Sequence, residues 1–259
     1  MSFWKNLFNR NTGDREITGK LAWLGVDMHN HILPGIDDGS PDVAQSLKLI
    51  RGLKELGIHK SISTPHVMHG VHDNTPVTIQ DAHQKLKEAI ANEGMKFELE
   101  YSAEYMIDDQ LESWIKSDNL CPLPNRHVLI EMSYLAESRA LFQTIKDLQE
   151  KGFQPILAHP ERYNYYHQNF KIYKEIKDAG CLLQLNLLSI SRYYGEHVKS
   201  IALTLIKSGM YDLVGTDVHH DKHMNALKVI AGKYDTFDLL KDNPIKNSVI
   251  FEDNQKLAI

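Results

Sequence analysis

The sequence predicts an α/β fold in which parallel strands alternate with helices around a barrel. Three observations support this: apolar strand-like runs recur seven times in 259 residues, helical patterns separate them, and every run ends in a histidine, carboxylate or asparagine. Strands that alternate with helices form parallel sheets, and seven repeats favour a barrel over an open sheet. In such barrels the strand ends converge on one rim, where the active site lies.

The elements follow one another from residue 22 onward. Predicted strands lie near 22–28, 58–63, 96–103, 127–132, 154–158, 181–187 and 212–216. The clearest helix lies between Pro41 and Gly57, because apolar residues recur there at helical spacing between a start and a stop signal. Similar helical patterns occupy 76–93, 137–151, 168–179, 196–208 and 223–232.

The chain divides into a short leader and one domain. Residues 1–20 are expected to form a flexible leader, and residues 21–259 a single barrel domain that includes the C-terminal tail. The leader lacks the continuous apolar core of a signal peptide, and no apolar run is long enough to span a membrane. We therefore expect a cytoplasmic protein without stable membrane insertion, whose oligomeric state the sequence leaves open.

Composition argues against several classes of protein. The net charge is −5 with a pI near 6.3, and no cluster of lysine and arginine is long enough to follow a phosphate backbone, so nucleic acid is not an expected partner. Two cysteines cannot build a disulfide framework. A cysteine-dependent phosphatase is also excluded, because neither cysteine has an arginine six positions later.

The first candidate site is the pair His29 and His31, followed by Asp37 and Asp38. Residues two apart in a strand point to the same face, so the two imidazoles can bind one metal ion. An HxH pair alone is a weak signal, but the turn that follows could fold an aspartate back over the same metal. Either aspartate could instead serve as an ordinary turn residue, and which of them would be the ligand is left open.

The other strand ends add further histidines and carboxylates. A glutamate at the end of a buried strand is costly unless it is paired or binds a cation. A mixed set of imidazoles and carboxylates without thiolate suits Mn²⁺, Fe²⁺ or Zn²⁺, and nine ligands exceed what one ion can use, so two or three ions are implied. The candidates are His29, His31, Asp38, His66, Glu104, Glu131, His159, Asp217 and His219.

Arg162 follows His159 by three residues and is the candidate for binding an anionic substrate. Its planar guanidinium could hold the oxygens of a phosphoryl group while His159 holds metal. The alternative is that Glu161 pairs with Arg162 and makes it structural.

The strings DMHNHILPGIDDGS, STPH, LIEMSY, AHPERY and GTDVHH, in this order, resemble the PHP (polymerase and histidinol phosphatase) superfamily. More narrowly, they resemble the bacterial manganese-dependent tyrosine-protein phosphatases of capsular and exopolysaccharide gene clusters. The resemblance covers residues 22–225 or so. It implies a distorted (β/α)₇ barrel of the PHP type with a trinuclear site, usually of manganese, although iron or zinc is possible.

The resemblance also implies roles for individual residues. His29, His31, Glu104 and Asp217 would hold the first metal; Glu104 would bridge to a second, completed by Glu131 and His159; and Asp38, His66 and His219 would hold the third. Arg162 and Asp38 would be catalytic, and Arg162 would also bind substrate. The family has a further arginine shortly after the DxH motif that is missing here, so Lys222 or His223 is expected to supply its positive charge.

The implied activity is hydrolysis of phosphotyrosine in a protein, with a bacterial tyrosine kinase as the expected partner. Histidinol phosphate, or another small phosphomonoester, is an alternative substrate because the superfamily shares this chemistry. An amidohydrolase would also begin with HxH, but it usually uses a carboxylated lysine where this chain has glutamates. An alternative of another class is a catalytically idle metal-binding scaffold for polysaccharide assembly.

Overall fold

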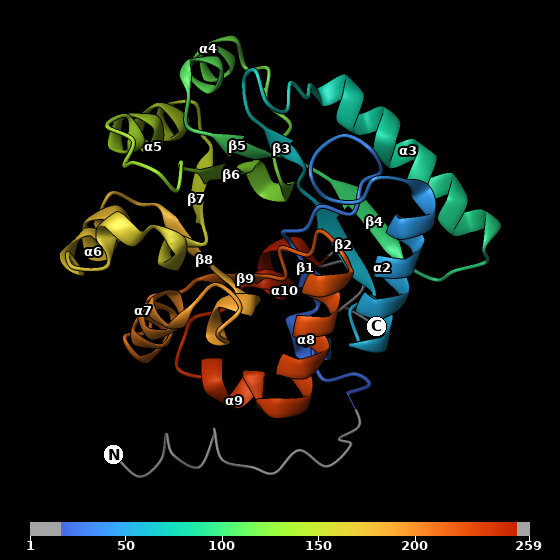
Figure 1. The fold of residues 1–259 in the computed structure, drawn as a ribbon. Coiled ribbons are helices and arrows are strands. Elements are labelled where there is room, and N and C mark those ends of the chain that lie inside the picture. The colour runs from blue at the N-terminus through green and yellow to red at the C-terminus, as the bar shows by residue number, and fades with distance from the viewer. Residues whose placement is uncertain (1–16, 253–259) are drawn as a thin grey trace.

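The structure is a computed structural model, and it describes residues 17–252 (Figure 1). Its strands are β1 (Val26–Asp27), β2 (Lys60–Ser63), β3 (His66–Val67), β4 (Glu98–Tyr101), β5 (Glu104–Met106), β6 (His127–Glu131), β7 (Gln154–Ala158), β8 (Leu182–Asn186) and β9 (Leu213–Gly215). Its α-helices are α2 (Val43–Glu55), α3 (Pro76–Asn92), α4 (Asp109–Ser117), α5 (Leu141–Glu150), α6 (Lys171–Asp178), α7 (Glu196–Lys207), α8 (Asp221–Lys233), α9 (Thr236–Leu240) and α10 (Asn247–Phe251).

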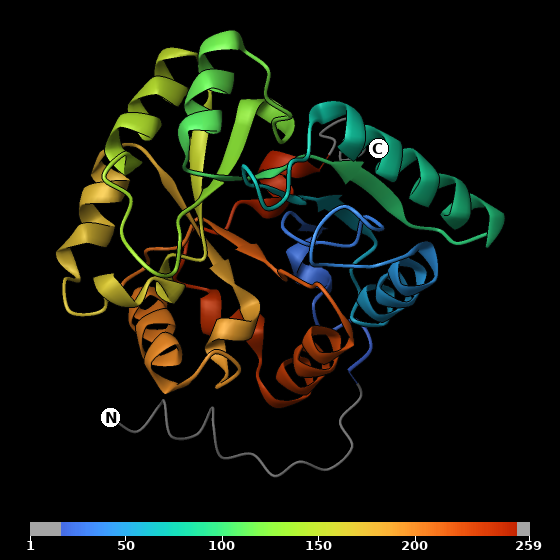
Figure 2. The ribbon, with the colours of Figure 1, turned by 45° about the horizontal axis from the view of Figure 1, so that its top comes forward.

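The strands form a curled parallel sheet in two parts, as in a half-barrel. One part has the order β1-β2-β4 and the other β3-β5-β6-β7-β8-β9, and every strand pair is parallel. Helices α3 to α7 lie on the outside of the curl (Figures 1 and 2). Beyond the ends of β1 and β9, Asn30 and Val218 form an isolated parallel bridge, so the first and last strands also meet.

The strand boundaries differ from the prediction in the first half of the chain. The predicted strand over 22–28 is wrong at its start, because Ala22–Leu24 form a 3₁₀ turn and Gly25 adopts a positive φ of 67° before β1. Each of the predicted strands 58–63 and 96–103 is continued, after a break, by a second short strand. Pro65 lies in the first break, where it has no N–H to donate to a ladder. The later predicted strands correspond to β6, β7, β8 and β9.

Two elements of the C-terminal tail were not predicted. Helices α9 and α10 each have five residues, too few to show a helical period. Asn247 of α10 donates hydrogen bonds to the carbonyl oxygens of Val26 and Val214, and Phe251 packs with Val26, Ile62 and other residues of one buried cluster. The tail therefore packs on the amino-terminal ends of β1 and β9, away from the strand ends that carry the candidate site.

The predicted helices are all present, although α5 and α6 begin a few residues later than expected. Residues 1–16 of the predicted leader lie outside the described residues, and the rest of the leader contacts the end of α2, where Gly19 donates a hydrogen bond to the carbonyl of Glu55. Over 17–252, no helix is both long and apolar enough to cross a membrane.

Candidate metal centre

The nine candidate ligands come together at the carboxyl ends of the strands. Their ligand atoms form four groups that share members, and within each group the ligand atoms lie within 4.8 Å of one another. Six of the seven strand runs contribute; β8 does not. His29 and His31 follow β1, Asp38 lies on the next loop, His66 is in β3, Glu104 in β5, Glu131 ends β6, His159 follows β7, and Asp217 and His219 follow β9.

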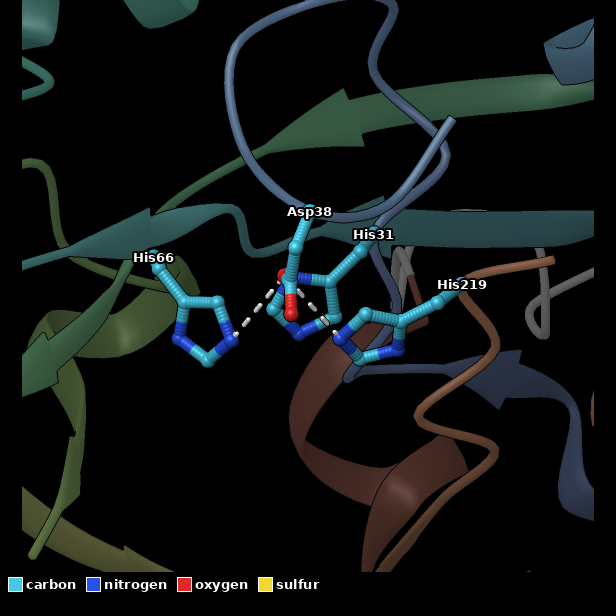
Figure 3. A group of neighbouring side chains, drawn as sticks. All are labelled: His31, Asp38, His66 and His219. Atoms are coloured by element: carbon cyan, nitrogen blue, oxygen red, sulfur yellow. Dashed lines mark ion pairs between the residues drawn. The ribbon is translucent and has the colours of Figure 1, made fainter. Parts of the chain in front are cut away.

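The first group contains His31, Asp38, His66 and His219 (Figure 3). Asp38 Oδ1 lies 3.6 Å from His66 Nε2 and 3.5 Å from His219 Nε2. The rings of His31 and His219 stack with centroids 3.9 Å apart. Asp38 is the most exposed member, with 62% of its side chain accessible. This group therefore lies at the open side of the cluster.

Glu104 lies at the centre of the cluster. Its Oε2 is 3.3 Å from His29 Nε2, 3.4 Å from His31 Nε2 and 3.1 Å from His66 Nδ1. Its Oε1 is 2.9 Å from His159 Nε2. Two oxygens that face different histidines give this carboxylate the geometry of a bridging ligand.

Asp217 and Glu131 complete the two sides of the cluster. Asp217 Oδ1 lies 3.4 Å from both His29 Nε2 and His31 Nε2, and Glu131 Oε1 lies 2.8 Å from His66 Nδ1. His66 consequently belongs to two groups, whereas the family resemblance places it on one metal only.

The donor atoms fit a group of divalent cations. His66 Nδ1, Glu104 Oε2 and Glu131 Oε1 are buried and make no hydrogen bond among the described residues, although they lie close to one another. Buried charged groups without partners are unfavourable, and a cation between them would satisfy all three. Imidazoles and carboxylates without thiolate are ligands that Mn²⁺, Fe²⁺ and Zn²⁺ accept.

Neighbouring charges keep two carboxylates of the cluster, Asp217 and Glu104, ionised. Burial alone would raise the pKa of Asp217, but its interactions with His29, His219, His31 and Arg162 outweigh burial and hold that pKa well below its usual range. The pKa of Glu104 is low for the same reason, through His29 and His66. Burial lowers the pKa of His219, with further lowering from His31, which favours the neutral imidazole that metals bind.

The two aspartates left open by the sequence have different roles. Asp37 Oδ2 lies 2.7 Å from His31 Nδ1 and accepts a hydrogen bond from the backbone N–H of His66. These contacts, above all with His31, lower the pKa of Asp37 to about 2 although burial opposes them. Asp37 thus orients His31 from behind, and Asp38 is the aspartate that faces the cluster.

Arg162 lies between two tyrosine rings. Its guanidinium carbon is 4.5 Å from the ring centroid of Tyr134 and 4.2 Å from that of Tyr194, and Nη1 donates a 2.9 Å hydrogen bond to Asp217 Oδ2. The alternative pairing with Glu161 is wrong. Glu161 is buried and instead accepts hydrogen bonds from the Tyr211 hydroxyl and the Asn186 backbone N–H, two partners that are distant in sequence.

A pocket of about 740 Å³ opens over the cluster. Arg162 and His223 line it together with six of the candidate ligands, and its apolar lining includes Met68, Val71, Met106 and Leu135. His223 is buried, and its Nδ1 accepts a hydrogen bond from the His219 backbone N–H. Lys222 is exposed on α8 and is not among the lining residues, because it lies on a different face of the helix from His223. The prediction that Lys222 binds substrate is therefore not supported by its position.

Four site residues escaped the sequence analysis: Tyr134, Gln184, Asn186 and Tyr194. Gln184 and Asn186 lie two residues apart in β8, which is the spacing that singled out His29 and His31. Their neutral amides gave no signal of a metal centre, because amides are not among the usual ligands of these metals. Tyr134 and Tyr194 lie in loops, where no pattern indicates which residues they contact.

Comparison with known proteins places the chain in a family. A family model described as "Capsular polysaccharide synthesis, CpsB/CapC" matches residues 25–244. The chain belongs to this family. The resemblance inferred from the motifs is thus confirmed, down to the group of capsular phosphatases.

Individual relatives agree with the family assignment. The tyrosine-protein phosphatase YwqE of Bacillus subtilis is 30% identical over 201 residues, which cover 77% of this chain and 79% of YwqE. The tyrosine-protein phosphatase CpsB of Streptococcus pneumoniae is 27% identical over 235 residues, which cover 85% of this chain and 97% of CpsB. A crystal structure from a study of YwqE and CpsB, described as "unique metal-dependent tyrosine phosphatases", matches with a TM-score of 0.71 at 27% identity and covers 85% of this chain and 96% of that one.

Proposed function

We propose that this chain is a metal-dependent protein-tyrosine phosphatase of capsule or exopolysaccharide synthesis. The observation that carries the proposal is the convergence of nine imidazole and carboxylate ligands under an open pocket, in a chain whose family members CpsB and YwqE are named tyrosine-protein phosphatases. The substrate is a phosphotyrosine protein, and we propose a bacterial tyrosine kinase as the partner. A cytoplasmic location stays a prediction.

We further propose that the curled sheet is a distorted (β/α)₇ barrel of the PHP type, and that residues 21–259 form one domain. Two features support this. Treating β2 with β3, and β4 with β5, as single interrupted strands leaves seven strands. The bridge between Asn30 and Val218, with hydrogen bonds from Asp217 N to His29 O and from His31 N to Val218 O, joins the first strand run to the last.

The proposed metal ligands are the nine residues of the cluster, with two to three ions, Mn²⁺ being the preferred one and Fe²⁺ or Zn²⁺ the alternatives. His29, His31, Glu104 and Asp217 would hold one ion, Glu104 with Glu131 and His159 a second, and Asp38, His66 and His219 a third. When bound, such ions supply a hydroxide near neutral pH and neutralise the phosphoryl oxygens.

Residues around the pocket would bind the phosphoryl group and assist the leaving group. Arg162 has five N–H donors, and its bond to Asp217 uses only one of its nitrogens, so others remain for the phosphoryl oxygens as negative charge develops. Asp38, at the open side, is the carboxyl that can exchange a proton with the leaving oxygen. A phenolate, with a parent pKa of about 10, needs little such help, so phosphotyrosine is the easier substrate. His223 lies near the ring of Tyr194, which Arg162 also contacts, and would border the phosphoryl group on that side of the pocket.

The pocket also suits an aromatic leaving group. Val71 and Leu135 expose 64% and 95% of their surface, and Met68, Met106 and Tyr134 line the same pocket. A phenyl ring above the metal ligands would bury against these apolar side chains, whereas a serine phosphate would be too short to do so.

The proposal is tested by comparing substrates on purified, Mn²⁺-loaded protein. A phosphotyrosine peptide should be hydrolysed with a higher kcat/KM than a matched phosphoserine peptide or histidinol phosphate. Faster turnover of histidinol phosphate would favour the small-molecule alternative. If metal-loaded protein releases phosphate from none of the three substrates, the idle scaffold is favoured. Dephosphorylation of an autophosphorylated capsule tyrosine kinase tests the partner.

A further inference from the structure

Strand β8 is the only one of the seven strand runs that contributes none of the nine candidate ligands, yet it lies between β7 and β9, whose ends carry three of them. Its two inward side chains at the carboxyl end are Gln184 and Asn186, both fully buried. A buried neutral amide needs hydrogen-bond partners, and the partners of these two amides include three candidate ligands, His29, His159 and Asp217.

Gln184 contacts two of the ligand residues. Its Oε1 accepts a 3.3 Å hydrogen bond from the backbone N–H of His159 and lies 2.9 Å from His29 Nδ1, while Nε2 donates to the carbonyl of Leu185. The backbone N–H can only donate, so the atom facing it is the amide oxygen. Because that oxygen can only accept, His29 carries its proton on Nδ1. His29 Nε2, which faces Glu104 and Asp217, is therefore the nitrogen available to a metal ion.

Asn186 acts on the neighbouring carboxylate in the same way. Its Oδ1 accepts a 2.9 Å hydrogen bond from the backbone N–H of Leu188, which fixes the orientation of the amide, and Nδ2 donates a 2.6 Å bond to Asp217 Oδ2. Arg162 donates to the same oxygen. With Oδ2 bound to two donors, Oδ1 of Asp217 is the oxygen that faces His29 and His31.

We infer that β8 is the positioning strand of the metal centre. Gln184 selects the Nδ1–H tautomer of His29, and Asn186 sets the rotation of the Asp217 carboxylate. Both act through a ligand, without contact to metal or substrate. The inference rests on the proposed metal centre, and it identifies the residues that prepare this centre before a metal arrives.

The expected effect is on metal affinity more than on stability. Hydrogen-bond partners behind metal ligands typically contribute about 10- to 100-fold to affinity. Gln184→Met keeps the volume but removes the acceptor, and Asn186→Leu removes the donor. Gln184→Glu is the conservative variant, because a protonated carboxyl in this buried position offers the same acceptor to His29 and the same donor to Leu185.

The matched control is Asn243→Ala. Asn243 is also a buried amide with two backbone hydrogen bonds, to Tyr211 N and Ile206 O, but it is not part of the cluster. Its loss should lower the melting temperature and leave Mn²⁺ affinity unchanged. Any drop in affinity that merely follows lost stability would appear in this control.

The experiment measures Mn²⁺ dissociation constants on metal-stripped full-length protein by chelator competition, together with melting temperatures. Gln184→Met and Asn186→Leu should each weaken binding about 10- to 100-fold, and Gln184→Glu should stay closer to wild type. Nitrogen-15 NMR of the Zn²⁺-loaded protein, which is diamagnetic, should show His29 protonated on Nδ1 and free of a proton on Nε2 in wild type, and should show a loss of this single state in Gln184→Met.

Two results would overturn the inference: wild-type affinity in both β8 variants, or an equal loss of affinity in the Asn243 control. His29 protonated on Nε2 and not on Nδ1 in the Zn²⁺-loaded wild-type protein would overturn the part that concerns Gln184, even if a variant failed to fold. Failure of the wild-type protein to bind Mn²⁺ is a separate outcome, since it removes the proposed metal centre itself.

Discussion

Replacing Arg162 by lysine separates a phosphatase from a generic metal hydrolase. The Arg162 side chain is 19% exposed, its guanidinium stacks between Tyr134 and Tyr194, and it lines the pocket, so it lies where an anionic substrate must arrive. Lysine keeps the positive charge but loses the planar fork and both ring contacts. The substitution therefore tests geometry at constant charge.

The size of the effect follows from the contacts. A hydrogen bond to a charged group contributes about 1.5–3 kcal/mol, and about 1.4 kcal/mol corresponds to a factor of ten. Loss of one such bond to the phosphoryl group should lower kcat/KM by roughly ten- to a hundredfold, and loss of two by up to about a thousandfold. Metal content should stay unchanged, because Asn186 still holds Asp217 Oδ2.

The assay combines metal stoichiometry, melting temperature and aryl-phosphate kinetics on one preparation. Arg126→Lys is the matched control, because Arg126 also stacks on a ring, that of Phe153 at 4.0 Å, and donates to the Gly152 carbonyl, but lies outside the pocket. An unchanged kcat/KM in Arg162→Lys would refute the role in substrate binding. A loss of metal equal to the loss of activity would make Arg162 a support of Asp217 instead.

Four further predictions follow from the same contacts. His159→Ala removes the partner of Glu104 Oε1 and should cut activity by at least about a hundredfold while the protein still folds, as checked by kinetics and circular dichroism. Leu135→Ser should raise KM for a phosphotyrosine peptide several-fold, with little change in kcat, because its side chain is exposed at the pocket. Chelation of metal should lower the melting temperature, and Mn²⁺ should restore it, because Glu104 and Glu131 otherwise keep buried oxygens without partners. Burial lowers the pKa of His83, so the folded state disfavours its protonation. The stability that neutral His83 contributes above about pH 6.5 is therefore lost as the pH falls. His83→Gln should make the free energy of unfolding less dependent on pH in denaturant titrations between about pH 7 and 5.

Each of these has a result that contradicts it. Wild-type turnover in His159→Ala would remove that residue from the site. An equal rise of the inhibition constant of inorganic phosphate, measured as a competitor, would show that Leu135 acts on the phosphoryl group and not on the ring. A melting temperature insensitive to chelator would argue that the cluster binds no ion in the folded protein, and an unaltered pH profile in His83→Gln would assign the acid sensitivity to other groups.

The sequence allowed the cluster to be predicted because its signals are local. A histidine or glutamate directly after an apolar run is visible without knowledge of neighbouring strands, and parallel topology then brings the run ends together. His66 and Glu104, for example, are register partners of β3 and β5. The break around Pro65 could not be recognised as the start of a new strand, since an interrupted strand and a strand end look alike in the sequence.

Contacts that join distant segments were not predictable in the same way. Glu161 and Arg162 are adjacent, which suggested an ion pair. In the structure Glu161 accepts hydrogen bonds from Tyr211 and Asn186, whereas Arg162 pairs with Asp217. The choice between such partners depends on packing in the folded state, which no spacing in the sequence encodes. The alternation in β8 was visible, but its amides became informative only once their partners were known.

The amides of β8 also form hydrogen bonds with two ligand residues whose backbone is strained. His159 and Asp217 adopt positive φ angles of 34° and 51°, a conformation that costs side-chain-bearing residues about 1–3 kcal/mol each. Gln184 accepts a hydrogen bond from the backbone of His159, and Asn186 donates one to the side chain of Asp217. The strand between the two strained positions thus supplies one stabilising hydrogen bond to each. A metal ligand at Gln184 or Asn186 would have to give up that bond to reach an ion, so one of the two strained positions would lose a hydrogen bond. Neutral amides on β8 therefore support the ligands on both flanking strands without competing with them for metal.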